Sequence, residues 1–128
     1  MTDASDVILL SLTYLLIKHA VADFFLQTPF QYQNKGRYGH PGGLLHCAIH
    51  LVLTIPVFWI VPSSIPQLMA VILVGEFVVH YHVDWSKEAV LKRYDWTPDT
   101  AAFWRAMGVD QLAHGLTYVA IVWVLATY

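Results

Sequence analysis

Four long apolar stretches, separated by more polar connections, run along the chain. They cover approximately residues 7–27, 44–61, 66–84 and 103–127. Each meets or nearly meets the length of about 20 residues that an α-helix needs to span a hydrocarbon core of about 30 Å. The pattern predicts an all-α protein, in which four transmembrane helices form one bundle and residues 1–128 form a single integral membrane domain.

The second and third stretches are expected to form an antiparallel hairpin. Only the turn sequence PSSI, residues 62–65, separates them. Pro56 lies inside the second stretch and predicts a kink rather than a break, because neighbouring helices in a membrane bundle can satisfy the freed carbonyl. The first stretch does not resemble a cleaved signal peptide, since it begins with Asp3 and Asp6 instead of basic residues and its apolar run is too long.

Composition supports a membrane protein and argues against nucleic-acid binding. Hydrophobic residues make up 57% of the chain and charged residues only 12%, whereas a soluble domain usually carries about a quarter charged residues. The formal net charge of -2 provides no basic field for phosphate groups, so we expect membrane lipid and no nucleic acid among the partners. The lone cysteine, Cys47, cannot form an internal disulfide.

The cations are distributed on one side of the predicted helices. All seven lie in or beside the first and third connections: Lys18, Lys35, Arg37, Lys87, Lys92, Arg93 and Arg105. The N-terminal arm, the PSSI turn and the C-terminal tail have none. The positive-inside rule therefore predicts that both long connections are cytoplasmic and that both termini are extracytoplasmic.

In each predicted helix, successive ionisable residues are four positions apart, so that they lie on the same face of the helix. The set is His19 and Asp23; His46 and His50; Glu76, His80 and Asp84; and Asp110 and His114. His82 lies on another face and is excluded. By the helical rise of about 1.5 Å per residue, all nine lie within about 15 Å of the cytoplasmic boundary. Because a charged side chain facing lipid costs about 2.5 to 3.5 kcal/mol, we expect these residues to face one another.

Imidazoles and carboxylates at this spacing are typical metal ligands, as in helical zinc sites. We therefore expect a divalent metal, zinc before others, as one or two ions. The expected ligands are His46, His50, His80, Asp84, Asp110 and His114. His19 and Asp23 are candidates for a second metal, for residues that orient the ligands, or for an acid/base pair.

Two further residues receive candidate roles. Glu76 lies deepest in the third helix and is a candidate general base for catalysis. Lys87 lies one turn beyond Asp84 on the same face, where it would contact a substrate headgroup, or alternatively extend toward water or pair with a charge.

The ordered blocks KHAVADFFLQT, NKG, LLHCAIH, EFVVHYHVDWSK and DQLAHGLT resemble the signatures of a family of small bacterial and phage membrane proteins of unknown function. The resemblance extends from His19 to Thr117 and implies a four-helix, multi-pass protein of the bacterial inner (plasma) membrane. The pattern is also similar, more loosely, to inner-membrane metal-dependent hydrolases and to alkaline ceramidases, whose zinc is held by histidines and an aspartate. Those families differ in helix number, and this chain lacks a clear counterpart of their serine.

The expected function is metal-dependent hydrolysis of a membrane-associated substrate at the cytoplasmic face. A metal or proton transporter is an alternative, but the outer halves of the helices offer only Thr54, Thr117 and Tyr118 for a polar path, unless a homo-oligomer completes it. A non-catalytic scaffold is the other alternative, in which the polar residues serve packing specificity and bind no metal.

Overall fold

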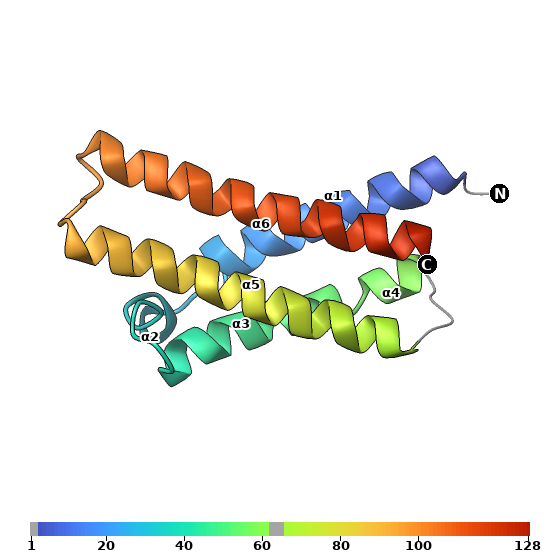
Figure 1. Cartoon of the computed structure of the whole chain (residues 1–128), viewed down its shortest axis with the longest axis horizontal. Helices are drawn as coiled ribbons and strands as arrows, with labels where there is room; N and C mark the ends of the chain where they lie inside the picture. Colours follow the sequence, from blue (N-terminus) through green and yellow to red (C-terminus); the bar gives the residue numbers. More distant parts are fainter. Residues whose placement is uncertain (1–2, 62–65) are drawn as a thin grey trace.

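The computed structural model describes residues 3–61 and 66–128, and these residues form helices and short connections (Figure 1). Four segments are long and apolar enough to cross a membrane, which confirms the predicted number of spans. The helices are α1 (Ala4–Phe24), α2 (Pro29–Tyr32), α3 (Pro41–Thr54), α4 (Val57–Ile60), α5 (Pro66–Arg93) and α6 (Ala101–Thr127), with α3 and α4 together making one span. The predicted PSSI turn lies outside the described residues.

The third helix is longer than the apolar stretch of about residues 66–84 from which it was predicted, because α5 continues to Arg93. The extension is rich in good helix formers, namely Lys, Glu, Ala, Leu and Arg, and its Leu91 is buried. Apolar length measures how much of a helix fits in hydrocarbon, not where the helix stops. α1 similarly begins and ends three residues earlier than predicted, after Asp3 as its N-cap.

Two structural details were not predicted from the apolar pattern, one in the second span and one in the connection that precedes it. The helix is interrupted at Pro56 rather than only kinked: α3 ends at Thr54 and the single turn of α4 begins at Val57. Proline has no N–H to continue the hydrogen-bond ladder. The first connection contains the short helix α2, which begins with a capping box between Thr28 and Gln31.

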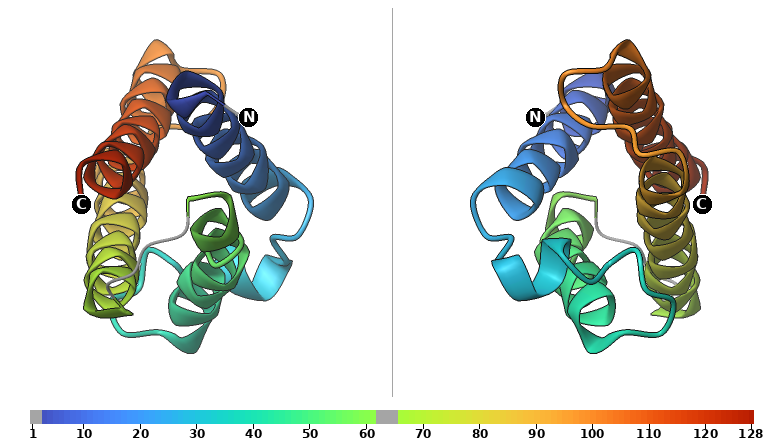
Figure 2. Two further views of the ribbon diagram at one scale, coloured as in Figure 1. Left: turned by 90° about the vertical axis from the view of Figure 1, so that its right-hand side faces the viewer. Right: turned by 90° about the vertical axis from the view of Figure 1, so that its left-hand side faces the viewer.

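The four spans form a closed bundle in which each contacts two neighbours. α1 packs against α3 and α6, and α5 also packs against α3 and α6. α3 and α5 run antiparallel, as predicted for the hairpin (Figure 1). Both ends of the chain lie at one end of the bundle, whereas α2 and the α5–α6 connection lie at the other, which we call the connection end (Figures 1 and 2).

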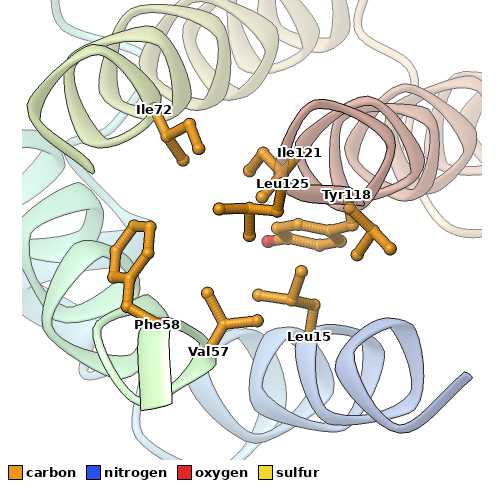
Figure 3. Close-up of a cluster of buried hydrophobic side chains, with 8 residues drawn as sticks. Leu15, Val57, Phe58, Ile72, Tyr118, Ile121 and Leu125 are labelled. Carbon is orange, nitrogen blue, oxygen red and sulfur yellow. The ribbon is translucent and has the colours of Figure 1, made fainter. Parts of the chain in front are cut away.

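The interior of the bundle is divided into an apolar half and a polar half. Toward the chain termini, eight buried side chains form an apolar plug (Figure 3). It consists of Leu15, Val57, Phe58, Ile72, Tyr118, Ile121, Val122 and Leu125. Toward the connection end most of the buried polar side chains are ionisable, and they lie among a few buried apolar residues such as Ala22 and Leu91. The outer surface, by contrast, exposes large apolar residues such as Leu9, Val71 and Trp123, as expected of a protein surrounded by lipid.

Candidate metal centre

Five histidines and three aspartates meet in the polar half of the bundle. All eight side chains are buried, and each span supplies two of them at a spacing of four residues. This His/Asp cluster consists of His19 and Asp23 from α1, His46 and His50 from α3, His80 and Asp84 from α5, and Asp110 and His114 from α6. The four polar stripes predicted from the sequence are therefore brought together in one place.

The ligand atoms of the cluster converge in three overlapping groups, each with its atoms within 4.8 Å of one another. The groups are Asp23, His46, His50 and His80; His19, His80 and His114; and Asp84, Asp110 and His114. His80 and His114 each belong to two groups, so they link the cluster into one continuous site. Asp23 lies with the α3 histidines and also keeps the contact with His19, 3.2 Å from its Nε2, that their spacing on α1 predicts.

The surroundings of His46 show why these contacts are not ordinary hydrogen bonds alone. Its Nε2 lies 3.1 Å from Asp84 Oδ2, 3.2 Å from Asp23 Oδ1 and 3.4 Å from His80 Nε2. One ring nitrogen carries at most one hydrogen, so it cannot donate a well-formed hydrogen bond to all three neighbours. A contact that the hydrogen does not serve brings two electron-rich atoms together, an arrangement that a cation between them would stabilise.

Two aspartates connect the histidines. Asp23 Oδ1 lies 3.0 Å from His50 Nε2, and Asp23 Oδ2 lies 3.2 Å from His19 Nε2. Asp84 presents Oδ1 to His114 Nε2 at 3.3 Å, while Asp84 Oδ2 faces His46. A carboxylate that presents its two oxygens to different histidines can ligate two cations or orient one cation's ligands.

Several buried atoms of the cluster have no hydrogen-bond partner among the described residues. They include His19 Nε2, the Nδ1 atoms of His46 and His50, and Asp110 Oδ1. A buried polar atom without a partner is unfavourable by about 1 to 3 kcal/mol. His19 Nε2 lies 3.2 Å from Asp23 Oδ2, and Asp110 Oδ1 lies 3.7 Å from His114 Nε2, so a metal bound among these residues would supply the missing interaction. The donor set therefore fits a divalent cation.

Neighbouring polar residues orient the cluster. The Tyr118 hydroxyl lies 2.9 Å from His19 Nδ1, which leaves His19 Nε2 to face the aspartates. The Gln111 amide donates to Asp110 Oδ2 at 3.0 Å and reaches Asp23 Oδ2 at 3.4 Å. Such outer contacts fix the rings and carboxylates of metal sites.

The remaining two predicted site residues lie at the edges of the cluster. Glu76 belongs to none of the three ligand groups; its Oε1 pairs with Lys18 Nζ at 2.6 Å and accepts a hydrogen bond from Thr54 at 2.9 Å. Lys87 Nζ lies 3.1 Å from Glu88 and 3.8 Å from Asp110 Oδ1. Charge pairing thus occupies Lys87 in this structure, beside the third ligand group.

Three buried partners of the cluster were not predicted as site residues. Tyr118 orients His19, Lys18 compensates Glu76, and Lys35 reaches in from the first connection to within 3.3 Å of Asp84 Oδ2. The signal for Lys18 was available: a cation inside an apolar span needs an anionic partner. No local pattern marks Lys35, because its burial depends on how the connection folds over the helix ends.

A small cleft leads from the connection end toward the cluster. Its volume is about 230 Å³, and its lining includes Asp23, Lys35, Lys87 and Glu88 together with apolar side chains of α1, α5 and α6. Asp23 is a member of the first ligand group. The cleft therefore reaches one edge of the cluster, at Asp23.

Comparison with known proteins connects this cluster to a family. The family model described as "Protein of unknown function (DUF3307)" matches residues 11–128. The match includes the whole His/Asp cluster and confirms the resemblance to a family of unknown function. No curated protein and no solved structure matches the chain.

Proposed function

The chain belongs to the DUF3307 family, and from the geometry of its buried cluster we propose that it is a membrane-embedded metal-dependent hydrolase. The observation that carries the proposal is the convergence of five imidazoles and three carboxylates in overlapping ligand groups. The proposed substrate is membrane-associated, and one member of the cluster, Asp23, lines a cleft at the connection end.

The ligand groups suggest how one or two ions would be held. Asp23, His46, His50 and His80 offer four ligand atoms, a number that suits tetrahedral zinc. Asp84, Asp110 and His114 offer three, which leaves a position for water or substrate. His19 adjoins both sets through His80 and His114. Zinc is our first choice because imidazole nitrogen and carboxylate oxygen are its usual ligands in catalytic sites.

A divalent metal in such a site supplies Lewis acidity and lowers the pKa of bound water to about 7. The residues of the chain would supply the rest of the chemistry. Asp23 and Asp84 hold the imidazoles in their orientations, and Asp110 Oδ1 is free to accept a proton or a metal bond. Glu76 as the general base requires its unpartnered Oε2 to act, because Lys18 and Thr54 occupy Oε1.

The two alternative functions fit the structure less well. A transporter needs a polar path through the bundle, but the apolar plug closes the half of the interior between the cluster and the chain termini. A scaffold needs polar contacts that satisfy each other and no access, whereas this cluster has unpartnered atoms and borders a cleft. Both observations favour a site whose ligand enters from the connection end of the bundle.

The one-sided distribution of cations supports a proposed orientation. Both connections would face the cytoplasm and both termini would face away from it, in a bacterial inner membrane. The His/Asp cluster would then lie toward the cytoplasmic leaflet.

Metal analysis of detergent-purified protein tests the proposal. We expect about one or two equivalents of zinc or another divalent ion, and we expect a chelator to lower the melting temperature because binding energy is lost. His80→Ala should lose most of the metal, since His80 belongs to two ligand groups. His82→Ala is the matched control, because His82 lies on the same helix but is exposed.

Metal-free wild-type protein of unchanged stability would refute the metal centre and leave the scaffold as the better explanation. Equal metal content in the His80→Ala and His82→Ala proteins would show that the ion is held elsewhere.

A further inference from the structure

A long groove runs along the outside of the bundle between α5 and α6. Its volume is about 860 Å³, which falls within the range of about 300 to 1,000 Å³ typical of ligand sites. Valine and alanine form most of its walls: Val78, Val79, Val83 and Val90 from α5, and Ala106 and Val109 from α6. Val78 is 49% exposed and Val109 68% exposed, so the groove opens to the surroundings of the bundle rather than to its core.

The groove has the length of one lipid leaflet. Its α5 wall runs from Val78 to Val90, which corresponds to about 18 Å at the rise of an α-helix. Half of a hydrocarbon core of about 30 Å is of similar length. One end of the groove, at Val78 and Ala113, lies near the middle of α5 and α6. The other end lies near the connection between these two helices.

Positive charge is located toward the connection end of this apolar groove. Lys87 and Arg105 both contribute to its lining, together with Trp96 from the connection. Arg105 makes no ion pair with a described residue, and it lies in the first turns of α6. Lys87 is paired with Glu88 and lies 3.8 Å from Asp110, so Arg105 is the lining cation that has no ion-pair partner among the described residues. An apolar channel with such a cation toward one end is complementary to an amphiphile that carries a negative headgroup, which would take the place of Glu88 at Lys87.

The groove also reaches the His/Asp cluster. Asp110 lines the groove and at the same time belongs to the ligand group with Asp84 and His114. Asp110 Oδ1 lies 3.8 Å from Lys87 Nζ and 3.7 Å from His114 Nε2, and it has no hydrogen-bond partner among the described residues. A headgroup held by Lys87 would therefore lie beside the proposed metal centre.

We propose that this groove binds a membrane lipid with an anionic headgroup, and that this lipid class is the substrate of the hydrolase, an inference that rests on the proposed function. The hydrocarbon chain lies along the valine wall and the headgroup lies between Lys87 and Arg105. Hydrolysis of an ester or phosphoester there adds the hydroxyl of water to the acyl carbon or phosphorus and the proton to the leaving oxygen. The reaction needs no oxidant or reductant.

Native mass spectrometry of the full chain tests the groove directly. The probes are phosphatidylglycerol and phosphatidylcholine with identical acyl chains, which differ in headgroup charge. We expect phosphatidylglycerol to occupy one site preferentially. Arg105→Ala should weaken that binding about fivefold, the effect of one basic residue near an anionic headgroup. Ala106→Trp should abolish it by filling the groove.

Matched controls separate loss of the groove from loss of the fold. Arg37→Ala removes an equal charge from an exposed position in the other connection, and Ala120→Trp adds an equal volume to an exposed position of α6 outside the groove. Both should bind phosphatidylglycerol as wild type does. Melting temperature and metal content are measured for every variant in the same preparation.

The outcomes of the two proposals are distinguishable. Equal binding of both lipids, or variants that match their controls, would overturn the lipid assignment even if the protein contains metal. Selective, groove-dependent lipid binding by metal-free protein would overturn the hydrolase and leave only a lipid site. If metal-loaded protein binds phosphatidylglycerol but releases no hydrolysis products, lipids with an anionic headgroup are not the substrate.

Discussion

Lys18 and Glu76 form an ion pair at the boundary between the His/Asp cluster and the apolar plug. Their side chains are only 2% and 1% exposed, and Nζ lies 2.6 Å from Oε1. Lys18 also donates to the backbone carbonyl of His50 at 3.2 Å, and Thr54 donates to Glu76. The pair thus ties α1, α3 and α5 together beside the proposed metal ligands.

Removing the charge of one partner of this pair should lower the stability of the protein far more than removing both charges. Glu76→Gln leaves the Lys18 ammonium without a counter-charge and should destabilise the protein by about 3 to 5 kcal/mol. The double variant Lys18→Met with Glu76→Gln should recover most of that stability. Chemical denaturation in detergent measures the free energy of unfolding of the wild type, of Glu76→Gln and of the double variant.

The same variants test the role of Glu76 in catalysis. If Glu76 is the general base, the stable double variant keeps its metal and loses about 10² to 10⁴ in turnover. Full turnover by the double variant would assign Glu76 a structural role only, and loss of its metal would make Glu76 a ligand.

At the scale of elements, the connection between α1 and α3 contributes two buried side chains, Gln31 and Lys35, to the packing of the bundle. It contains α2, and it delivers Lys35, only 5% exposed, to Asp84. Gly36 permits this approach: a Cβ at that position would lie 2.9 Å from Glu88 Cβ on α5. The connection therefore closes over the cluster instead of extending into solvent.

Gly36→Ala should push the connection away from α5. We expect a loss of stability of about 1 to 3 kcal/mol, as for overpacked positions, and faster loss of metal to a chelator as Lys35 withdraws from Asp84. Gly108→Ala is the control, because a Cβ there meets nothing within 4 Å. Indistinguishable stability and chelation rates for the two variants would show that the close approach at Gly36 is unimportant.

At the scale of the whole molecule, the buried polar side chains and the apolar plug occupy different halves of the bundle along its axis. The cations follow the same division, since Lys35 and Arg37 lie in the α1–α3 connection and Lys92 and Arg93 lie in the last turn of α5, next to the α5–α6 connection. A membrane with a preferred side for positive charge would fix the molecule in one orientation.

Cysteine labelling tests that orientation. In a Cys47→Ala background, an impermeant maleimide added to intact cells should label Ser5→Cys, which is exposed near the N-terminus. It should label Arg37→Cys, exposed in the first connection, only after the inner membrane is opened. The reverse pattern would place the cluster at the opposite face of the membrane.

The spans and the cluster could be predicted from sequence because both depend on local periodicity. Apolar length gave four spans, and the four-residue spacing of pairs such as His46 and His50 placed each pair on one buried face. Which pairs combine could not be predicted: Asp23 joins His46, His50 and His80 because of how α1 packs on α3. Lys35 and the groove beside Arg105 likewise depend on tertiary packing, which no spacing within a helix records.

The distribution of the ligands among the helices has a consequence for biogenesis. The group of Asp23, His46, His50 and His80 draws only on α1, α3 and α5, whereas the group of Asp84, Asp110 and His114 requires α6. A chain emerging from the ribosome can thus complete the first group once three spans are inserted. The second group forms only when α6 follows, so the proposed metal centre would mature in the order in which these helices are synthesised.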